Sequence, residues 1–450
     1  MLHLFDTAER CVVPIEFRDS GKVSMYVCGP TVYGPPHLGH GRFALVFDIL
    51  RRYLEWSGHE VRYVSNITDI DDRIIQRAAE EGRSTEEVAK EYERAWLVGM
   101  DAIGVKRPSD DPHATGYVER MVALIGDLID RGFAYETDDG VYFTADRIED
   151  YGLLARQTID SLRAGARVEI DDQKRSPTDF VLWKKAKPGE PEWPSPWGSG
   201  RPGWHTECVV MSLDLLGDGF DIHGGGQDLA FPHHENERAQ AVAIGRTFAR
   251  HWVHNGFVEV GGEKMSKSLG NFTNLMDVVE AGDPRAYRLL ALRAHYRSPI
   301  EVNQTATDDA SKALASLDAF ARRSVAWPTT PPDASVLDEF RVAMDDDLDT
   351  PKAIAQLFTL VRRANQLADG GDTDAAAPLA AAVREICRAV GLELHEGAGD
   401  IPDAVADLAR RRDEARAAKG WVEADRLRDE IQAAGFLVED TAAGTVVRPA

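Results

Sequence analysis

The 450-residue sequence predicts an α/β fold in which a parallel sheet, interrupted by an insertion, precedes a helical bundle and a small C-terminal domain. Three observations support this prediction. Strand-like and helix-like segments alternate over the first 104 residues, this regularity lapses over about 118–200, and Ala-rich helical sequence occupies about 305–395.

The alternating segments begin with a buried strand over 23–28, followed by a helix over about 41–57 whose apolar residues have near 3.6-residue spacing. A second strand is expected over 61–64, and the capping box Ser84-x-x-Glu87 opens a helix that ends near residue 103. Strand, helix, strand and helix in this order are typical of a parallel sheet.

The sequence becomes irregular after these elements. Asp139-Gly140 between two short apolar runs predicts a β-hairpin. The Pro- and Trp-rich stretch 188–204 is expected to contain no regular element. We therefore expect residues 118–200 to be an insertion between two halves of the sheet domain.

The composition is that of a globular protein, with 43% hydrophobic and 28% charged residues. A formal charge of −23 argues against a general nucleic-acid binder, because phosphate contacts drive non-specific binding. Basic side chains nevertheless gather near the C-terminus, where a linker over 397–402 precedes an expected basic helix pair and a hairpin over 436–447. Four scattered cysteines, with no apolar membrane span and no signal peptide, predict a cytoplasmic protein without a disulfide scaffold.

The first candidate site is His37-Leu38-Gly39-His40, between a predicted strand and a helix N-terminus. The free N–H groups and positive dipole end of such a terminus suit a phosphate, and Gly39 allows a nucleotide to approach the backbone closely. The two imidazoles could stabilise charge that develops on phosphoryl oxygens. Taken alone, the motif could equally be a His-rich loop that caps a helix.

The second candidate site is Lys264-Met265-Ser266-Lys267-Ser268, in a segment flanked by glycines. Two lysines on such a loop can reach a triphosphate and neutralise charge in the transition state. An isolated lysine pair would more simply be a solvated loop. Together and in this order, the two motifs predict a site that activates a substrate with a nucleotide.

The chain resembles the class I aminoacyl-tRNA synthetases, whose two signatures these motifs are, and within that class the cysteinyl-tRNA synthetase family. Further segments carry the resemblance, which runs from about residue 3 to 448: Met25–Tyr33, Asn66–Asp72, Gly203–Cys208, Phe220–Gly226, Phe231–Glu237 and Trp421–Arg426. The resemblance implies a Rossmann-like catalytic domain with a connective insertion, a stem-contact region, a helical bundle and an anticodon-binding domain. The expected ranges are 1–117 and 201–250 (catalytic), 118–200 (insertion), 251–304 (KMSKS loop and stem contact), 305–396 (bundle) and 397–450 (anticodon binding).

A metal site is the third expectation. Cys28 ends a predicted strand, Cys208 is expected to start a helix, and His233 and Glu237 are four residues apart. These side chains are acceptable zinc ligands, but two buried cysteines and a satisfied histidine explain the pattern as well. His234 and Glu235 are rival ligands from local sequence alone. The resemblance selects a set of four: Cys28, Cys208, His233 and Glu237.

The resemblance implies an ATP-dependent ligase that activates L-cysteine as cysteinyl-adenylate and transfers it to the 3′-terminal adenosine of cysteine tRNA. One zinc ion per chain would select the substrate thiol against serine, because pocket shape separates such near-isosteres by only a few kcal/mol. ATP would act with Mg²⁺, and the chain would be a monomer that binds no membrane.

The resemblance also assigns roles to individual residues. Catalysis falls to His37, His40, Lys264 and Lys267. ATP binding adds to these Gly39, Gly224, Gly225, Gly226 and Ser266. The expected cysteine pocket consists of Thr68, Trp204 and Asp228. The basic tail is expected to bind tRNA through Arg410, Arg411, Arg412, Arg416, Lys419 and Arg426.

Three other functions fit parts of the sequence. A ligase that joins activated cysteine to an amino sugar would share the sheet domain but lack the C-terminal domain. A silent RNA-binding paralogue would not need the intact histidine and lysine motifs. A small nucleotidyltransferase would share only HxGH and would be shorter.

Overall fold

The computed structural model describes residues 1–155, 173–260, 263–264, 273–397, 402–441 and 444–449. The chain forms two compact units, each built from several segments. The first comprises Met1–Ser311, Leu337–Leu357 and Arg388–Leu392, and the second comprises Lys312–Val336, Phe358–Cys387 and Glu393–Ala450. None of the described helices is long and apolar enough to cross a membrane.

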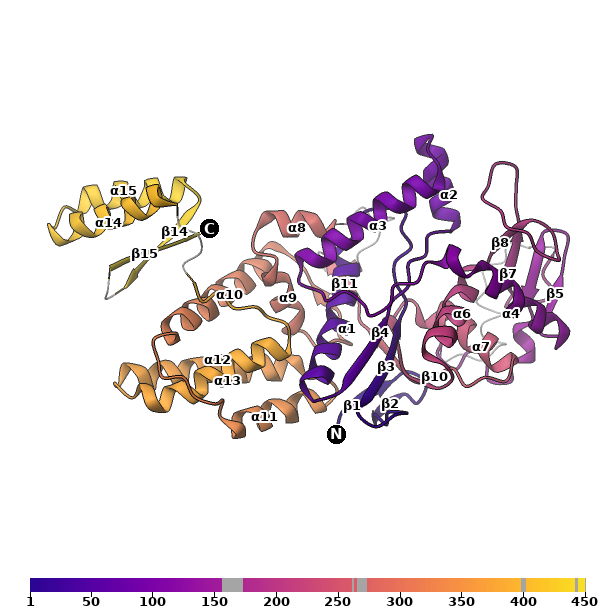
Figure 1. Ribbon diagram of the computed structural model, residues 1–450, viewed down its shortest axis with the longest axis horizontal. Helices are drawn as coiled ribbons and strands as arrows, with labels where there is room; N and C mark the ends of the chain where they lie inside the picture. Colours follow the sequence, from indigo (N-terminus) through magenta and orange to yellow (C-terminus); the bar gives the residue numbers. More distant parts are fainter. Residues whose placement is uncertain (156–172, 261–262, 265–272, 398–401, 442–443, 450) are drawn as a thin grey trace. The chain divides into compact units, whose positions relative to one another are not determined.

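The first unit contains a parallel sheet, as the sequence predicted (Figure 1). Its strand order, which the sequence did not predict, is β10-β9-β3-β4. Its strands are β3 (Lys22–Val27), β4 (Glu60–Val64), β9 (Phe220–Gly226) and β10 (Ala249–Asn255). The two central strands are almost completely buried, because helices cover the sheet. All four strands run in the same direction, so their carboxyl ends share one edge of the sheet.

The helix after β3 is α1 (Leu38–Trp56), which begins three residues before the predicted start at residue 41. The difference arises because His37 serves as the N-cap and accepts a hydrogen bond from the backbone N–H of His40. Helix α2 (Asp72–Glu81) and helix α3 (Thr85–Ala102) follow β4, and the predicted capping box between Ser84 and Glu87 is confirmed.

The segment expected to be an insertion contains helix α4 (Val118–Asp130) and most of a separate antiparallel sheet of order β5-β6-β7-β8, whose last strand extends two residues beyond the expected end at residue 200. Its strands are β5 (Ala134–Glu136), β6 (Gly140–Phe143), β7 (Phe180–Lys185) and β8 (Gly200–Pro202). The predicted hairpin at Asp139-Gly140 is confirmed. The expectation of no regular element over 188–204 is wrong for β8, whose edge position tolerates its proline.

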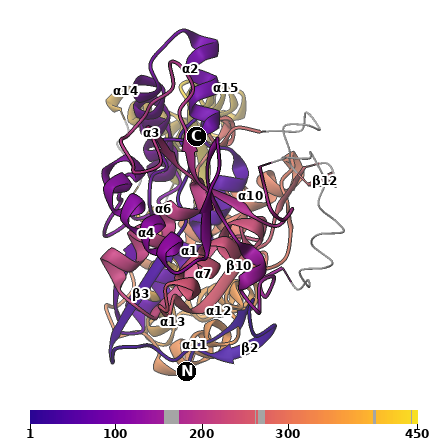
Figure 2. The ribbon, with the colours of Figure 1, turned by 90° about the vertical axis from the view of Figure 1, so that its right-hand side faces the viewer.

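Helix α6 (Trp204–Leu216) returns the chain to the parallel sheet, and helix α7 (Glu235–Ala243) follows β9 after a π-helical turn at Ala230–His234. Helices α4, α6 and α7 lie together in both ribbon views (Figures 1 and 2). A buried core joins α6 to the parallel strands through side chains that include Tyr26, Cys208 and Phe220.

Shorter elements complete this region of the chain. They are β1 (His3–Asp6), β2 (Cys11–Pro14), β11 (Val258–Val260), β12 (Glu263–Lys264), β13 (Ile300–Glu301), α8 (Leu275–Ala281) and α9 (Arg285–Leu292). The expected helical sequence over 305–395 is confirmed as α10 (Gln304–Ser324), α11 (Ala334–Asp345), α12 (Thr350–Asp369) and α13 (Thr373–Ala389).

The end of the second unit has the predicted helix pair and hairpin. These are α14 (Asp403–Ala417), α15 (Trp421–Ala433), β14 (Phe436–Thr441) and β15 (Gly444–Pro449). A small core that contains Val405, Ile431 and Val447 holds the helices against the hairpin. Most of the expected linker over 397–402 lies outside the described residues.

Candidate active site and metal-binding cluster

The N-terminus of α1 carries the first signature. The His37 ring accepts from the His40 backbone N–H, and the His40 ring accepts from the His37 backbone N–H, both at 3.3 Å. The two rings are stacked with centroids 3.6 Å apart. This reciprocal cap fixes both imidazoles at the positive end of the helix dipole, where an anion would be stabilised.

A cavity of about 650 Å³ opens at the carboxyl edge of the parallel sheet. It brings together side chains from the ends of β3, β9 and β10 and from the starts of α1 and α6. The residues predicted from the sequence that line it are Cys28, His37, Gly39, His40, Trp204, Gly226 and Asp228. The sequence did not predict the other lining residues as part of the site: Gly29, Pro30, Thr31, Tyr33, Phe43, Arg73, Leu229 and Asn255–Val258.

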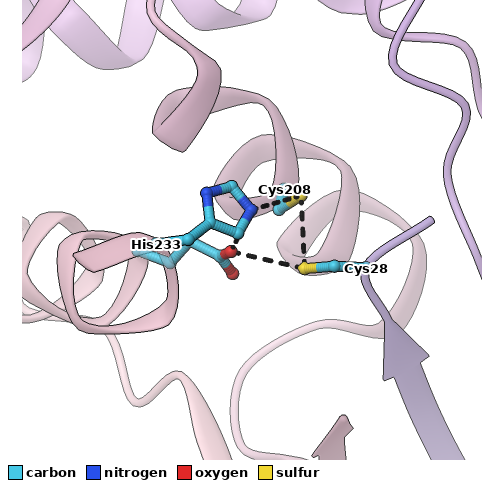
Figure 3. A group of neighbouring side chains, drawn as sticks. Cys28, Cys208 and His233 are labelled. Carbon is cyan, nitrogen blue, oxygen red and sulfur yellow. Dashed lines mark hydrogen bonds and ion pairs between the residues drawn. The ribbon is translucent and has the colours of Figure 1, made fainter. Parts of the chain in front are cut away.

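Four potential metal ligands meet beside this cavity (Figure 3). The Sγ atoms of Cys28 and Cys208 are 3.6 Å apart, and Glu237 Oε1 is 3.4 Å from Cys28 Sγ. The Nε2 atom of His233 lies 3.7 Å from Cys208 Sγ and 2.9 Å from Glu237 Oε1. The side chains are buried and point toward one another, and all four donor atoms lie within 4.8 Å of each other. Two sulfurs, one imidazole and one carboxylate form a donor set that suits zinc.

The local structure of these ligands differs in two details from the prediction. Cys208 lies in the second turn of α6 and does not start the helix. His233 belongs to the π-helical turn and Glu237 to α7, so these two residues, four apart in the sequence, lie on either side of a junction and not on one continuous helix. The two side chains still meet, because the turn continues directly into the helix.

The electrostatics of the cluster favour the charged forms of Glu237, His233 and Cys208, whereas burial and the adjacent Cys208 raise the pKa of Cys28 well above its usual value. Burial raises the pKa of Glu237, but the adjacent His223 and His233 outweigh it and hold that pKa well below its usual value. Burial lowers the pKa of His233, yet Glu237 and Cys208 raise it to about 10. Burial also raises the pKa of Cys208, while the hydrogen bond from Cys28 and the nearby His233 bring it down to about 6. Three of the four side chains therefore carry charge at neutral pH, and a cation would find a carboxylate and a thiolate among them.

The two rival ligands have different surroundings. Glu235 accepts from Arg238 through Oε1 and from the backbone N–H of Leu154 through Oε2, so both of its oxygens are engaged. His234 belongs to a second possible donor group with Cys28, His223 and Glu237. The two groups share Cys28 and Glu237, so the structure leaves His234 as an alternative.

The residues expected to bind cysteine are only partly brought together. Trp204 and Asp228 line the cavity, and the Trp204 ring stacks on His233 with centroids 3.8 Å apart. Thr68 is buried, and its hydroxyl donates to Glu207 at 2.8 Å. It is not among the residues that line the described cavity.

The three glycines at the end of β9 also differ from each other. Gly226 lines the cavity. A Cβ at Gly224 would lie 2.3 Å from Phe47 Cε1, and one at Gly225 would lie 2.8 Å from His234 Cε1. Packing within the protein therefore requires glycine at these two positions, whatever binds in the cavity.

The second signature lies mostly outside the described residues, which exclude Ser266 and Lys267. Lys264 ends β12, which pairs with β11. In the C-terminal helix pair, Arg410 and Arg426 are exposed and paired with nearby carboxylates. Arg412 is buried and bonds to Asp440 and Thr445, so it joins α14 to the hairpin. 

The parallel sheet, the stacked histidines at the start of α1 and the cavity between them define a class I aminoacyl-tRNA synthetase. Comparison with known proteins supports this class. Residues 14–312 match the family of class I (C) tRNA synthetase catalytic domains, residues 339–395 match the DALR domain, and residues 398–448 match the cysteinyl-tRNA ligase anticodon-binding domain.

Similar proteins include the cysteine–tRNA ligase of Halorhodospira halophila, 47% identical over 99% of both chains, and that of Chromobacterium violaceum, 45% identical over 100% of both. The chain belongs to the cysteine–tRNA ligase family. Solved structures of the same fold include methionyl-tRNA synthetase from Mycobacterium tuberculosis in complex with methionyl-adenylate. That structure has a TM-score of 0.59 and 16% identity, covering 82% of this chain and 89% of the other.

Proposed function

We propose that this chain activates L-cysteine with ATP and transfers the cysteinyl group to the terminal adenosine of cysteine tRNA. One observation carries the proposal: Cys28 belongs both to the cavity lining and to the buried four-donor cluster. The N-terminus of α1 on one side of the cavity suits a phosphate, and a metal ion held by the four-donor cluster on another side would bind a thiolate. This combination suits an adenylate of cysteine.

The residues of α1 would act on ATP. The His37 and His40 rings, which their reciprocal cap holds at the helix N-terminus, would stabilise the charge that develops on the α-phosphate when the cysteine carboxylate attacks it. Gly39 lines the cavity without a side chain, so the phosphates can approach the backbone. Lys264 and Lys267 would neutralise the remaining phosphate charge, Ser266 would donate a hydrogen bond to ATP, and Mg²⁺ would accompany the nucleotide.

The donor cluster fits zinc on the chemistry of its side chains. When bound, zinc would hold a thiolate much more tightly than a neutral hydroxyl and so select cysteine over serine. Cys28, Cys208, His233 and Glu237 would hold the ion. Trp204 stacks on the His233 ring and would help to orient it, and Asp228 at the cavity wall would bind the substrate ammonium.

The remainder of the chain would bind tRNA. We propose the division into catalytic domain (1–117 and 201–250), insertion (118–200), stem-contact region (251–304), bundle (305–396) and anticodon-binding domain (397–450). Support comes from the separate antiparallel sheet of the insertion and from the small separate core of the C-terminal helix pair. The basic side chains on α14 and α15, including the exposed Arg410 and Arg411, would contact the tRNA, whereas Arg412 would support them from within.

Cysteine-dependent exchange of pyrophosphate into ATP tests the activation step. The wild-type protein should support exchange with cysteine and much less with serine. Cys208→Ala should lose both exchange and stoichiometric zinc, whereas Cys11→Ala, at an exposed cysteine remote from the cluster, should keep both. Equal exchange with serine, or full exchange by Cys208→Ala, would contradict the proposed selection.

Charging of cysteine tRNA tests the role of the C-terminal helices. Arg410→Ala combined with Arg411→Ala should raise the KM for tRNA and leave cysteine-dependent exchange unchanged, because these residues are exposed on α14. Arg131→Ala, at the C-cap of α4, is the matched control, since this arginine is similarly exposed and paired with a neighbouring carboxylate. An unchanged KM for tRNA in the double variant would contradict the assignment.

A further inference from the structure

Two histidines outside the four-donor set each contact one of its members: His205 contacts His233, and His223 contacts Glu237. The Nδ1 atom of His205 lies 2.8 Å from the Nδ1 atom of His233. The Nε2 atom of His223 lies 2.6 Å from Oε2 of Glu237. Each contact engages the atom that faces away from the two cysteine sulfurs, and neither histidine was predicted from the sequence as a functional residue.

The contact of His205 decides which nitrogen of His233 can bind a cation. Nε2 of His233 is the atom that faces Cys208 and Glu237, so it must carry a lone pair when an ion is present. The ring proton is then on Nδ1 and needs an acceptor, which His205 Nδ1 supplies. A neutral His205 can accept at Nδ1 only if its own proton is on Nε2, so one contact fixes the tautomers of both rings.

The contact of His223 has the corresponding effect on Glu237. Oε1 of Glu237 faces Cys28 and His233, while Oε2 accepts a hydrogen bond from His223 Nε2. His223 is completely buried, and its Nδ1 has no hydrogen-bond partner among the described residues. An unpaired lone pair is tolerated there more readily than an unpaired N–H, so the ring proton belongs on Nε2, where the carboxylate accepts it.

We propose that His205 and His223 are positioning residues that limit His233 to Nε2 and Glu237 to Oε1 as donor atoms toward the zinc ion. This inference rests on the proposed zinc site. Since Oε2 is occupied by His223, Glu237 offers a single oxygen. The position that a second carboxylate oxygen would fill is thereby kept available for the sulfur of the substrate, on the side where Cys28 lines the cavity.

Paired substitutions separate hydrogen bonding from packing. His223→Phe keeps an aromatic ring beside Trp252, whose ring centroid lies 4.8 Å away, but it removes the donor. His223→Gln keeps an N–H near the position of Nε2. His205→Phe removes the acceptor, and His205→Asn retains an oxygen near the position of Nδ1. His254→Asn is the control, because His254 is also a buried histidine but bonds to His234 and Thr7.

Zinc affinity, measured in the full-length protein by competition with a chromophoric chelator, is the primary readout. His223→Phe and His205→Phe should weaken zinc binding about 10- to 100-fold. His223→Gln, His205→Asn and His254→Asn should remain within about threefold of wild type, well inside the loss expected when an outer hydrogen bond is removed. In the Co²⁺-substituted protein, His223→Phe should weaken the visible d–d bands, because a carboxylate that binds through both oxygens raises the coordination number.

Three results would overturn the inference. Wild-type zinc affinity in both phenylalanine variants would show that the contacts do not position the ligands. An equal loss in His223→Gln and His223→Phe would show that His223 is itself a ligand, because an amide cannot replace a ligating imidazole. An equal loss in His254→Asn would show either a packing effect or ligation by His234, to which His254 bonds, and either one contradicts the inference. Failure of the proposed zinc site looks different, since wild-type protein would then bind no zinc, and failure of the proposed selection would appear as equal exchange with serine by zinc-loaded protein. If His223→Phe does not fold, as judged by circular dichroism, the His205 pair decides the outcome in the same way.

Discussion

Gly224→Ala should destabilise the catalytic unit by about 2 kcal/mol, because the new methyl group would overlap a buried aromatic ring. The added Cβ would lie 2.3 Å from Cε1 and 2.6 Å from Cζ of Phe47. Phe47 is completely buried in α1, so its ring cannot move aside. Overpacking of this kind costs about 1–3 kcal/mol, and the severe overlap places this site at the upper end. Restricting the unfolded chain returns about 0.4–1 kcal/mol, which leaves the net value of about 2 kcal/mol.

Urea unfolding of a double-mutant cycle measures this overlap. Phe47→Leu alone should also destabilise, but the double variant should be more stable than the sum of the two losses by about 1 kcal/mol or more. Gly116→Ala is the matched control, because a Cβ there would meet no atom within 4 Å. The reasoning is refuted if Gly224→Ala is as stable as wild type, or if the two substitutions are additive. The same variants test the expected role of Gly224 in ATP binding, because a KM for ATP that stays high in the double variant would indicate a direct role for Gly224.

Three further predictions concern stability and metal content. Asp48→Asn should cost about 3–5 kcal/mol, because Asp48 and Arg288 form a buried ion pair at 2.6 Å and the arginine would be left unpaired. Burial raises the pKa of Asp48, but Arg288 and Arg52 outweigh it and lower that pKa below its usual value. The ionised carboxylate therefore stabilises the fold above about pH 4, and this stabilisation is lost as the pH falls further. Urea unfolding between pH 7 and pH 3 should show a smaller loss of stability on acidification in Asp48→Asn than in wild type, and parallel curves would contradict this. Arg412→Ala should destabilise the C-terminal helix pair by about 1–3 kcal/mol, because its hydrogen bonds to Asp440 are lost. Hydrogen exchange of the α14 amides measures this loss, and unchanged protection would contradict a stabilising role for Arg412. Chelation of zinc should lower the melting temperature, since zinc at 100 times its Kd stabilises the folded protein by about 2.7 kcal/mol. It should also abolish cysteine-dependent exchange. Recovery of that exchange with Mg²⁺ alone would refute a zinc site.

Local sequence patterns were sufficient for most of the regular elements. The strands around residues 23–28 and 61–64, the capping box at Ser84 and the hairpin at Asp139-Gly140 depend on neighbouring residues, and all are present. The start of α1 and the strand β8 could not be predicted in this way. The first depends on a reciprocal histidine cap, and the second on a partner strand that ends 15 residues earlier.

In the candidate site, too, the sequence predicted residue types and motifs, whereas contacts between distant segments required the structure. The types of the four potential ligands and the histidines of α1 were available from sequence, and the structure brings each set together. The surroundings of Thr68 and Gly224 could not be predicted from the sequence. Thr68 is buried beside Glu207 and Gly224 contacts Phe47, and both partners belong to distant segments of the chain. The sequence could identify these residues as members of a motif, but not what each side chain touches.

The sequence by itself determined the α/β order of elements, the two signature motifs and membership of a synthetase class, because these are recorded in local spacing and residue type. Only the tertiary structure decided that Cys28, at the end of β3, lines the cavity while also facing Cys208 on α6, 180 residues away. It also decided that His205 and His223 face the rear of the donor set. Hydrogen bonds act over about 3 Å, so partners that are distant in the chain are defined only once the sheet and its helices have packed together.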